Sequence, residues 1–277
     1  MSAVTPLRSL DRHPDLVAAA TYTREVPAPI AAVWENVHDW EHLPWLHDQA
    51  FTKIALREAG DWGWHADVGF PGDSEAEVEL VIDHAASCYV ARTRTEGTVR
   101  GETWTRLTPL ADDRTGVEVE FLLPAMPEEA LAQAGDAMVA LYTGLWDQDA
   151  EMIRVRDATD PGNRTASADR GPVELGAWST VRSTLPRVVE FGGHRFVLAL
   201  RGDRPVVFAA ECPHWRGPLE DCAIEVDGSV VCPWHGYRFD VETGRSSDGR
   251  GLKLRPAPRI ELDEAADSMR LVGSGNP

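Results

Sequence analysis

The sequence has few cysteines and no long hydrophobic run. Only four of its 277 residues are cysteine, too few for the disulfide-dense scaffold of a small secreted domain. No stretch approaches the roughly 18 apolar residues that a membrane-spanning helix needs. The first residues also lack the basic-then-apolar order of a signal peptide. We therefore expect a cytoplasmic protein that does not bind membranes.

Basic residues are scarce relative to acidic ones. The chain carries 27 Lys and Arg against 45 Asp and Glu, a formal net charge of −18 at pH 7. This balance disfavours nucleic acid and anionic membranes as partners. The Gly-x-Gly-x-x-Gly pattern of dinucleotide-binding folds is also missing. A chain of this length is expected to form one or two domains, each with room for a hydrophobic core.

Two of the four cysteines stand in a pattern with histidine. Cys212 and His214 form a Cys-x-His pair, and after a gap of 17 residues Cys232 and His235 form a Cys-x-x-His pair. Two thiolates and two imidazoles can hold one [2Fe–2S] cluster, with both Cys on one iron and both His on the other. A structural zinc site is the alternative, because it uses the same residue types. Zinc fingers usually pair Cys with Cys and His with His, so the pattern favours the cluster.

The residues around these pairs carry a family resemblance. The runs 212–219 and 232–240 resemble the two cluster-binding loops of Rieske proteins. Respiratory Rieske proteins join the loops by a disulfide at positions that match Gly217 and Trp234 here, so the resemblance points to the ferredoxin and oxygenase branch. It implies that the cluster is bound by Cys212, His214, Cys232 and His235.

The first half of the chain shows helix and strand patterns in a defined order. A β-rich run over 20–26 precedes a helical pattern over 30–37, and a second helical piece over 39–48 is expected to be broken by Pro44. Residues 1–18 show no periodicity and are expected to form a loose lead-in. A long helix should run from Pro127 to about Arg156. Between these helices, alternation and turn residues predict strands near 51–58, 62–69, 75–83, 88–95, 99–108 and 115–123.

This order of elements resembles the START-like, or helix-grip, fold. In that fold a curved antiparallel sheet wraps around the last helix and leaves an apolar cavity. The resemblance covers residues 18–158. Residues 159–172 are polar and contain Pro and Gly, which indicates a linker, and the strand patterns of residues 173–273 match an all-β Rieske domain. The sequence thus predicts an α+β chain with a helix-grip domain, a linker and a Rieske domain.

A second metal site is indicated in the first domain. His42 and His47 lie five residues apart, which on a regular helix would leave their rings about 140° apart, so a break near Pro44 is needed to bring them together. On the long helix, Asp149 falls within an apolar stripe that includes Met152. A buried carboxylate needs a partner. Two His and one carboxylate form the facial triad of non-haem iron(II) oxygenases.

These residues carry a second resemblance. Asp39, His42 and His47, with Asp149 on the last helix, resemble the iron site of Rieske non-haem oxygenases. The resemblance implies that His42, His47 and Asp149 bind a mononuclear iron. It also implies a catalytic role for Asp39, as the carboxylate that links an iron histidine to a cluster histidine. Two features differ from typical members: the Rieske domain comes last rather than first, and the catalytic domain is shorter.

The oxygenase interpretation predicts a reaction and its partners. A Rieske-type oxygenase would hydroxylate, demethylate or desaturate a small apolar substrate with O₂. No flavin or nucleotide motif is present, so electrons must come from a separate ferredoxin or flavin reductase. The resemblance also implies a homo-oligomeric ring, in which the cluster of one chain serves its neighbour.

A different arrangement of the same residues remains open. His42 and His47 can be exposed, and Asp149 can pair with a strand arginine such as Arg92 or Arg106. The chain would then be a START-like ligand-binding module fused to a Rieske ferredoxin, an electron carrier without mononuclear iron.

Overall fold

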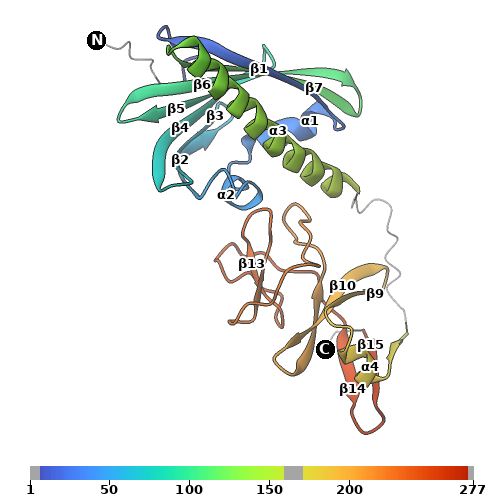
Figure 1. The fold of residues 1–277 in the computed structure, drawn as a ribbon. Coiled ribbons are helices and arrows are strands. Elements are labelled where there is room, and N and C mark those ends of the chain that lie inside the picture. The colour runs from blue at the N-terminus through green and yellow to red at the C-terminus, as the bar shows by residue number, and fades with distance from the viewer. Residues whose placement is uncertain (1–6, 159–170, 274–277) are drawn as a thin grey trace. The chain divides into compact units, whose positions relative to one another are not determined.

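The computed structural model describes residues 7–158 and 171–273. The chain forms two compact units, Met1–Arg154 and Val155–Pro277, called here the N-terminal and C-terminal domains. Figure 1 shows both, coloured along the chain. Most of the expected linker, residues 159–170, lies outside the described residues. No helix in the described part of the chain is long and apolar enough to cross a membrane.

The N-terminal domain is built on one antiparallel sheet of seven strands, in the order β1-β7-β6-β5-β4-β3-β2. Six of these strands are those expected from alternation and turn residues. The seventh, β1, comes first in the chain and pairs with the last strand, β7. An extra residue interrupts the pairing in β2, at Arg57, and in β6, at Arg100, and such bulges bend a sheet. The strands are β1 (Leu16–Val26), β2 (Lys53–Gly60), β3 (Gly63–Phe70), β4 (Ser74–Asp83), β5 (Cys88–Thr95), β6 (Thr98–Ala111) and β7 (Arg114–Pro124).

Three helices accompany this sheet: α1 (Ile30–His38), α2 (Leu43–Leu46) and α3 (Glu128–Ala158). Glu128 and Glu129 occupy the first turn of α3, where negative charge is favourable to the helix dipole. In Figure 1 the long α3 crosses one face of the sheet. That face and the helices enclose the core of the domain.

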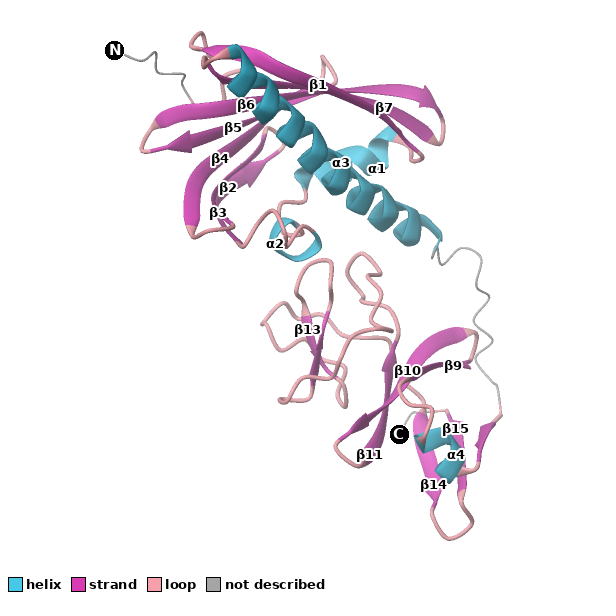
Figure 2. Ribbon diagram, in the orientation of Figure 1, coloured by secondary structure: helices cyan, strands magenta, loops and turns pink. Residues whose placement is uncertain are grey.

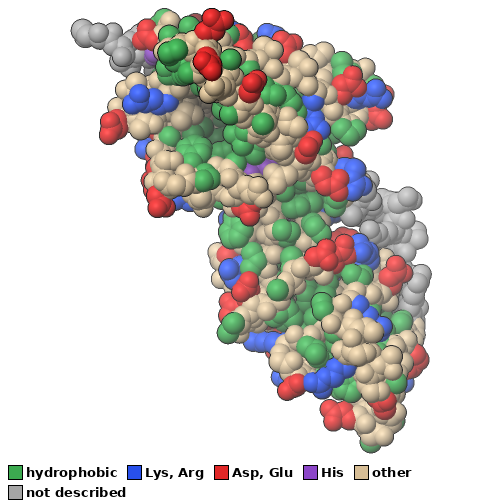
Figure 3. All heavy atoms as spheres, viewed as in Figure 1, with side chains coloured by type: hydrophobic (Ala, Val, Ile, Leu, Met, Phe, Trp, Pro, Cys, Tyr) green, Lys and Arg blue, Asp and Glu red, His purple; other side chains and the backbone are tan. Residues whose placement is uncertain are grey.

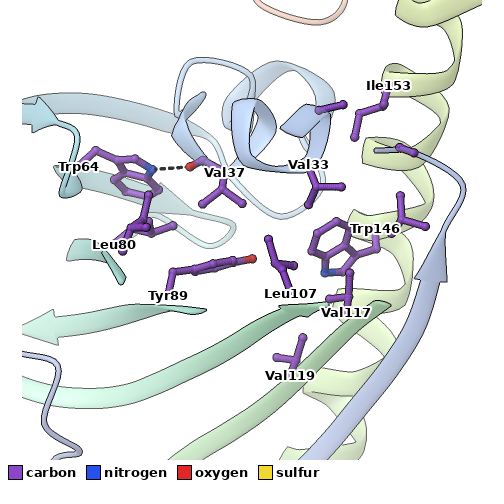
Figure 4. Packing of buried hydrophobic residues seen from close by; sticks show 14 of the residues in the cluster. Val33, Val37, Trp64, Leu80, Tyr89, Leu107, Val117, Val119, Trp146 and Ile153 are labelled. Carbon is purple, nitrogen blue, oxygen red and sulfur yellow. Dashed lines mark hydrogen bonds between the residues drawn. The ribbon is translucent and has the colours of Figure 1, made fainter. Parts of the chain in front are cut away.

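Alternation along the strands decides which side chains enter this core. Val78 and Leu80 of β4 are buried in the core cluster, whereas Glu79 between them points to the other face of the sheet. Figure 4 shows Trp64 and Trp146 among these apolar side chains, contributed by β3 and α3. The indole Nε1 of Trp64 donates a hydrogen bond to the backbone oxygen of Val37 at 3.2 Å, which ties β3 to α1.

The other face of the sheet carries a buried ion network. Arg92 is fully buried, its Nε donates to Glu102 Oε1 at 2.7 Å, and its Nη1 lies 3.4 Å from Glu79 Oε2. The backbone N–H of Arg8 donates to Glu79 at 2.6 Å, and that of His13 donates to Glu102 at 3.2 Å. Buried carboxylates need such donors.

The described residues that precede β1 therefore pack on the sheet. The sequence predicted a loose lead-in over 1–18, and for residues 7–15 this prediction is wrong. The contacts of this segment with Glu79, Arg92 and Glu102 are made by its backbone groups, which leave no periodic signal in the sequence.

The C-terminal domain consists of short strands and loops with one short helix, α4 (Trp178–Arg182) (Figure 2). Its three sheets have the orders β11-β10-β9, β12-β13 and β14-β15-β8. The whole chain is rich in sheet and has few helices, so the expected α+β class applies only loosely. The strands are β8 (Val173–Gly176), β9 (Arg187–Phe191), β10 (His194–Arg201), β11 (Arg204–Ala209), β12 (Ser229–Val231), β13 (Arg238–Asp240), β14 (Arg259–Asp263) and β15 (Ser268–Val272).

Candidate metal centres

His42 and His47 of the N-terminal domain flank a single helical turn. The helix α1 ends at His38, and Asp39 leaves helical geometry with φ −85° and ψ 86°. His42 immediately precedes α2 and His47 follows it, with φ −110° and ψ 39°. Pro44 occupies the first turn of α2, where the missing N–H of proline costs nothing. The helical piece expected over 39–48 is therefore confined to α2 between Asp39 and His47, and Pro44 opens this helix instead of breaking it.

This arrangement brings His42 and His47 onto Asp149 of α3. One donor atom from each of the three residues lies within 4.8 Å of the other two. Asp149 Oδ1 is 3.0 Å from His47 Nε2 and 3.5 Å from His42 Nε2. The side chains are buried, with 3%, 2% and 7% of the residue surface exposed for His42, His47 and Asp149. The three residues singled out in the sequence as metal ligands therefore meet in one buried cluster.

The arginines considered as partners of Asp149 are engaged elsewhere. Arg92 pairs with Glu79 and Glu102 on the other face of the sheet. Arg106 donates from Nη1 to the backbone oxygen of Ala86 at 3.4 Å. The alternative of exposed histidines and an Asp149–arginine pair does not describe this structure.

Each histidine of the cluster is also held through its second ring nitrogen. Asp39 Oδ2 lies 3.3 Å from His42 Nδ1, and Gln148 Oε1 lies 2.7 Å from His47 Nδ1. An oxygen acceptor at Nδ1 favours the tautomer that keeps its proton there, which leaves the Nε2 lone pair for a metal ion. The role of Gln148 is not among the sequence predictions, and its place beside Asp149 is the signal that could have found it.

The carboxylate of Asp149 dominates the electrostatics of this cluster. Burial lowers the pKa of His47, but the hydrogen bond and charge of Asp149, with the hydrogen bond of Gln148, outweigh burial and raise the pKa overall. Protonation of the ring and metal binding at its Nε2 therefore compete. Two imidazoles and one carboxylate, each imidazole with a partner at its other nitrogen, suit a divalent transition metal that keeps open positions.

A cavity of about 220 Å³ lies against the three donors. The space-filling view in Figure 3 shows a hollow in the N-terminal domain bordered by hydrophobic side chains. Burial raises the pKa of the cavity phenols Tyr89 and Tyr142, so both stay protonated. Apolar side chains make up most of the wall: Val37, Leu43, Ala50, Phe51, Trp64, Val68, Phe70, Val78, Leu80, Ala91, Met138, Leu141, Leu145 and Trp146.

The four predicted cluster ligands of the C-terminal domain come from two loops. The backbone N–H of Cys212 donates to Gly217 O, and that of Cys232 donates to Tyr237 O, each at 2.9 Å. The rings of His214 and His235 are nearly perpendicular, with centroids 4.5 Å apart. The loops thus face each other with two sulfurs and two imidazoles, the donor set of a Rieske cluster.

Glycine is required in both loops, for different reasons. Gly236 has φ +67°, a conformation that favours glycine. Gly217 has room only for hydrogen, because a Cβ there would lie 2.6 Å from Cys232 Sγ and 3.2 Å from the ring of Trp234. In the first loop the left-handed residue is Arg216, with φ +61°. Gly217 therefore serves close packing against the second loop rather than a left-handed turn.

The two buried thiols interact directly. The hydrogen bond between them raises the pKa of Cys212 and lowers the pKa of Cys232 to about 5. One thiolate is therefore available without any metal, and the second must lose its proton when a cluster binds. Together with the space that Gly217 leaves beside Cys232, the donor set fits a [2Fe–2S] cluster.

Two family models match the chain. The model of the polyketide cyclase / dehydrase and lipid transport family matches residues 17–154, and the Rieske [2Fe-2S] domain model matches residues 171–256. The chain carries a START-like domain followed by a Rieske domain. This domain order is the one predicted from the sequence. The Rieske domain gives the chain a [2Fe–2S] cluster and a role in redox chemistry with electron-transfer partners.

Curated relatives match only part of the chain. Apoptosis-inducing factor 3 from Mus musculus is 29% identical over 84 residues, which are 30% of this chain and 14% of that protein. Its Homo sapiens counterpart is 30% identical over 78 residues, 28% of this chain and 13% of that protein. The chain thus spans about one seventh of the length of the curated relatives that it matches.

Solved structures resemble each domain at low identity. A norcoclaurine synthase point mutant from Thalictrum flavum is 19% identical with a TM-score of 0.42, covering 51% of this chain and 98% of that one. The ZhuI aromatase/cyclase from Streptomyces sp. R1128 is 14% identical with a TM-score of 0.43, covering 55% and 98%. The ferredoxin of carbazole 1,9a-dioxygenase from Nocardioides aromaticivorans IC177 is 20% identical with a TM-score of 0.33, covering 38% and 100%.

Proposed function

We propose that this chain is a Rieske-type non-haem iron oxygenase acting on a small apolar molecule held in the N-terminal cavity. The observation that carries the proposal is the buried cluster of His42, His47 and Asp149 in the cavity wall, with donor atoms within 4.8 Å of one another. A buried His–His–Asp cluster of this kind has the composition of the facial triad of iron(II) oxygenases.

Different side chains have different roles in such an enzyme. His42, His47 and Asp149 hold the iron, while Asp39 and Gln148 fix the orientation of the two rings. Cys212, His214, Cys232 and His235 hold the [2Fe–2S] cluster. When bound, the cluster supplies single electrons and the iron activates O₂, which together hydroxylate, demethylate or desaturate the substrate. The apolar cavity wall excludes water and orients the substrate.

The proposal includes specific partners and an assembly. Electrons come from a separate ferredoxin or flavin reductase, and O₂ and the apolar substrate enter the N-terminal cavity. Asp39 is the carboxylate that links His42 to a cluster histidine, and the chains assemble into a homo-oligomeric ring that supplies this contact from a neighbour. Mixing Cys212→Ser and His42→Ala proteins, each inactive alone, should restore activity if electrons pass between chains.

A second candidate is a START-like ligand-binding module fused to a Rieske ferredoxin. The matches to apoptosis-inducing factor 3 extend over 84 and 78 residues, about the length of the Rieske match over 171–256, and a Rieske domain alone suffices for electron transfer. This candidate needs the cavity but no mononuclear iron.

Metal analysis distinguishes the two candidates. After anaerobic loading with iron(II), the oxygenase should hold about three iron atoms for every two acid-labile sulfides. The His42→Ala variant should fall to about two irons with unchanged cluster absorbance, because only the triad is broken. His38→Ala, at a neighbouring histidine outside the triad, is the control and should keep the full content. Equal iron in the wild type and His42→Ala would support the carrier instead.

A further inference from the structure

Asn36 is a polar residue buried in the apolar cavity of the N-terminal domain. It lies in α1, lines the cavity and is 5% exposed. Its Oδ1 is enclosed and has no hydrogen-bond partner among the described residues. Asparagine is a weak helix former, and Asn36 gains no capping role because α1 continues to His38. Neither the helix nor the core explains this residue.

The other buried polar side chains of the cavity wall each contact at least one polar neighbour among the described residues. Asp149 contacts both His42 and His47, and Thr103 hydrogen-bonds to Tyr142. Buried polar groups in proteins are nearly always paired, so an exception calls for a ligand, a water or a functional reason. Asn36 is such an exception, and it borders a cavity that can admit a ligand.

We propose that Asn36 is the recognition group for a hydroxyl on the substrate, so that the cavity takes a one- or two-ring apolar molecule carrying one hydroxyl. An amide both accepts and donates hydrogen bonds, and so does a hydroxyl, so the pair matches whichever way the amide is turned. The cavity volume of about 220 Å³ lies below the range of drug-sized pockets. The inference deepens the proposed function and rests on it, because the bound molecule is a substrate only if the proposed reaction takes place.

Binding of two matched probes tests this inference without turnover. Equilibrium dialysis against 2-naphthol and 2-methylnaphthalene gives a Kd for each, and the two probes differ only by a hydroxyl in place of a methyl group. A purely apolar cavity prefers the methyl compound. With Asn36 as partner, wild-type protein should bind 2-naphthol about tenfold more tightly, the value of one hydrogen bond.

Variants then assign the preference to a residue. Asn36→Leu, similar in shape but without the amide, should abolish or reverse the preference, and Asn36→Ala replaces it if the leucine protein lacks the wild-type circular dichroism. Thr93→Val is the control, because it removes a different polar group, a hydroxyl, from the same cavity wall and should keep the preference. No preference in the wild type, an unchanged preference in both Asn36 variants, or no binding of either probe would each overturn the inference.

The outcome of this binding test can be distinguished from the outcome of the test of the proposed function. The dialysis uses protein without reductant, so no turnover occurs and the Kd values do not depend on electron delivery. A protein that holds only about two irons yet prefers 2-naphthol through Asn36 would refute the oxygenase and retain the hydroxyl site. A protein with the full iron content and no preference would do the opposite.

Discussion

The two candidate metal centres of this chain are built in different ways. In the C-terminal domain, backbone hydrogen bonds from Cys212 and Cys232 close each ligand loop within six residues of the cysteine. In the N-terminal domain the donors come from the ends of α2 and from α3, and side chains orient them. One centre depends on the local path of two loops, whereas the other depends on how α3 packs against the segment that contains α2.

This difference predicts how each centre responds when one of its residues is substituted. A loop centre should be lost when one ligand or one close contact changes, because nothing else in the loop can replace it. A centre assembled from packed elements should weaken in steps, since its orienting side chains and the helix that carries Asp149 each contribute a part. The predictions below test this contrast, beginning with the largest expected effect.

Replacing Cys212 with Ser should abolish the visible absorbance of the cluster. Thiolate coordination is lost at one iron, and a serine hydroxyl is a poor ligand at neutral pH. Absorbance spectra and acid-labile sulfide measure the effect. Cys222→Ser is the matched control in the same domain, because the Cys222 thiol donates to the backbone oxygen of Pro218 at 3.6 Å. Full cluster absorbance in Cys212→Ser would rule out the assignment.

A single methyl group at Gly217 should damage the same centre. The added Cβ would lie 2.6 Å from Cys232 Sγ, so Gly217→Ala must push the loops apart, and overpacking of this kind costs about 1–3 kcal/mol. We expect lower cluster occupancy and faster bleaching in air. Gly273→Ala, with open space around its Cβ, should behave as wild type. If Gly217→Ala also does so, the loops are less tightly packed than the structure indicates.

The loop centre was the easier of the two to predict from sequence. Its ligands fall within 24 residues and their spacing is the signal. The donors of the other centre are separated by about a hundred residues, and only the apolar stripe of α3 pointed to Asp149. Pro44 was predicted to break a helix and instead opens one, because proline is compatible with both an interior break and the first turn of a helix.

Residues that act through tertiary contacts left little trace in the sequence. Gln148 and Asn36 are single polar residues in helices, where exposed positions are the common interpretation. The strands were predicted well because alternation has a period of two. By contrast, the packing of residues 7–15 depends on Arg92, Glu79 and Glu102, which only the folded sheet brings together.

Gln148→Leu should weaken iron binding without removing it. The hydrogen bond to His47 Nδ1 at 2.7 Å is lost while the three ligands stay, and such orienting partners are typically worth 10–100-fold in metal affinity. Competition for iron(II) with a chelator measures this change. Asp147→Asn is the control on the same helix, since Asp147 is exposed and pairs with Arg24. An unchanged affinity would mean that Gln148 does not orient the ring.

The smallest expected effects are those of two glycine-to-alanine substitutions in α3. Gly144 is exposed with open space around its Cβ, so Gly144→Ala should stabilise the helix by up to about 1 kcal/mol. Gly135 packs on β1, and a Cβ there would lie 2.6 Å from the backbone oxygen of Ala19. Gly135→Ala should therefore destabilise the domain by about 1–3 kcal/mol. Urea midpoints of the circular dichroism at 222 nm measure both changes.

The same pair of variants tests whether the two centres are independent. Asp149 lies on α3, so a helix displaced by Gly135→Ala should release mononuclear iron more readily, while Gly144→Ala should retain it as the wild type does. Neither substitution touches the loops of Cys212 and Cys232, so cluster absorbance should stay constant in both. Loss of cluster absorbance in Gly135→Ala would show that the loops depend on the N-terminal domain, and the contrast between a locally built centre and a packed one would not hold.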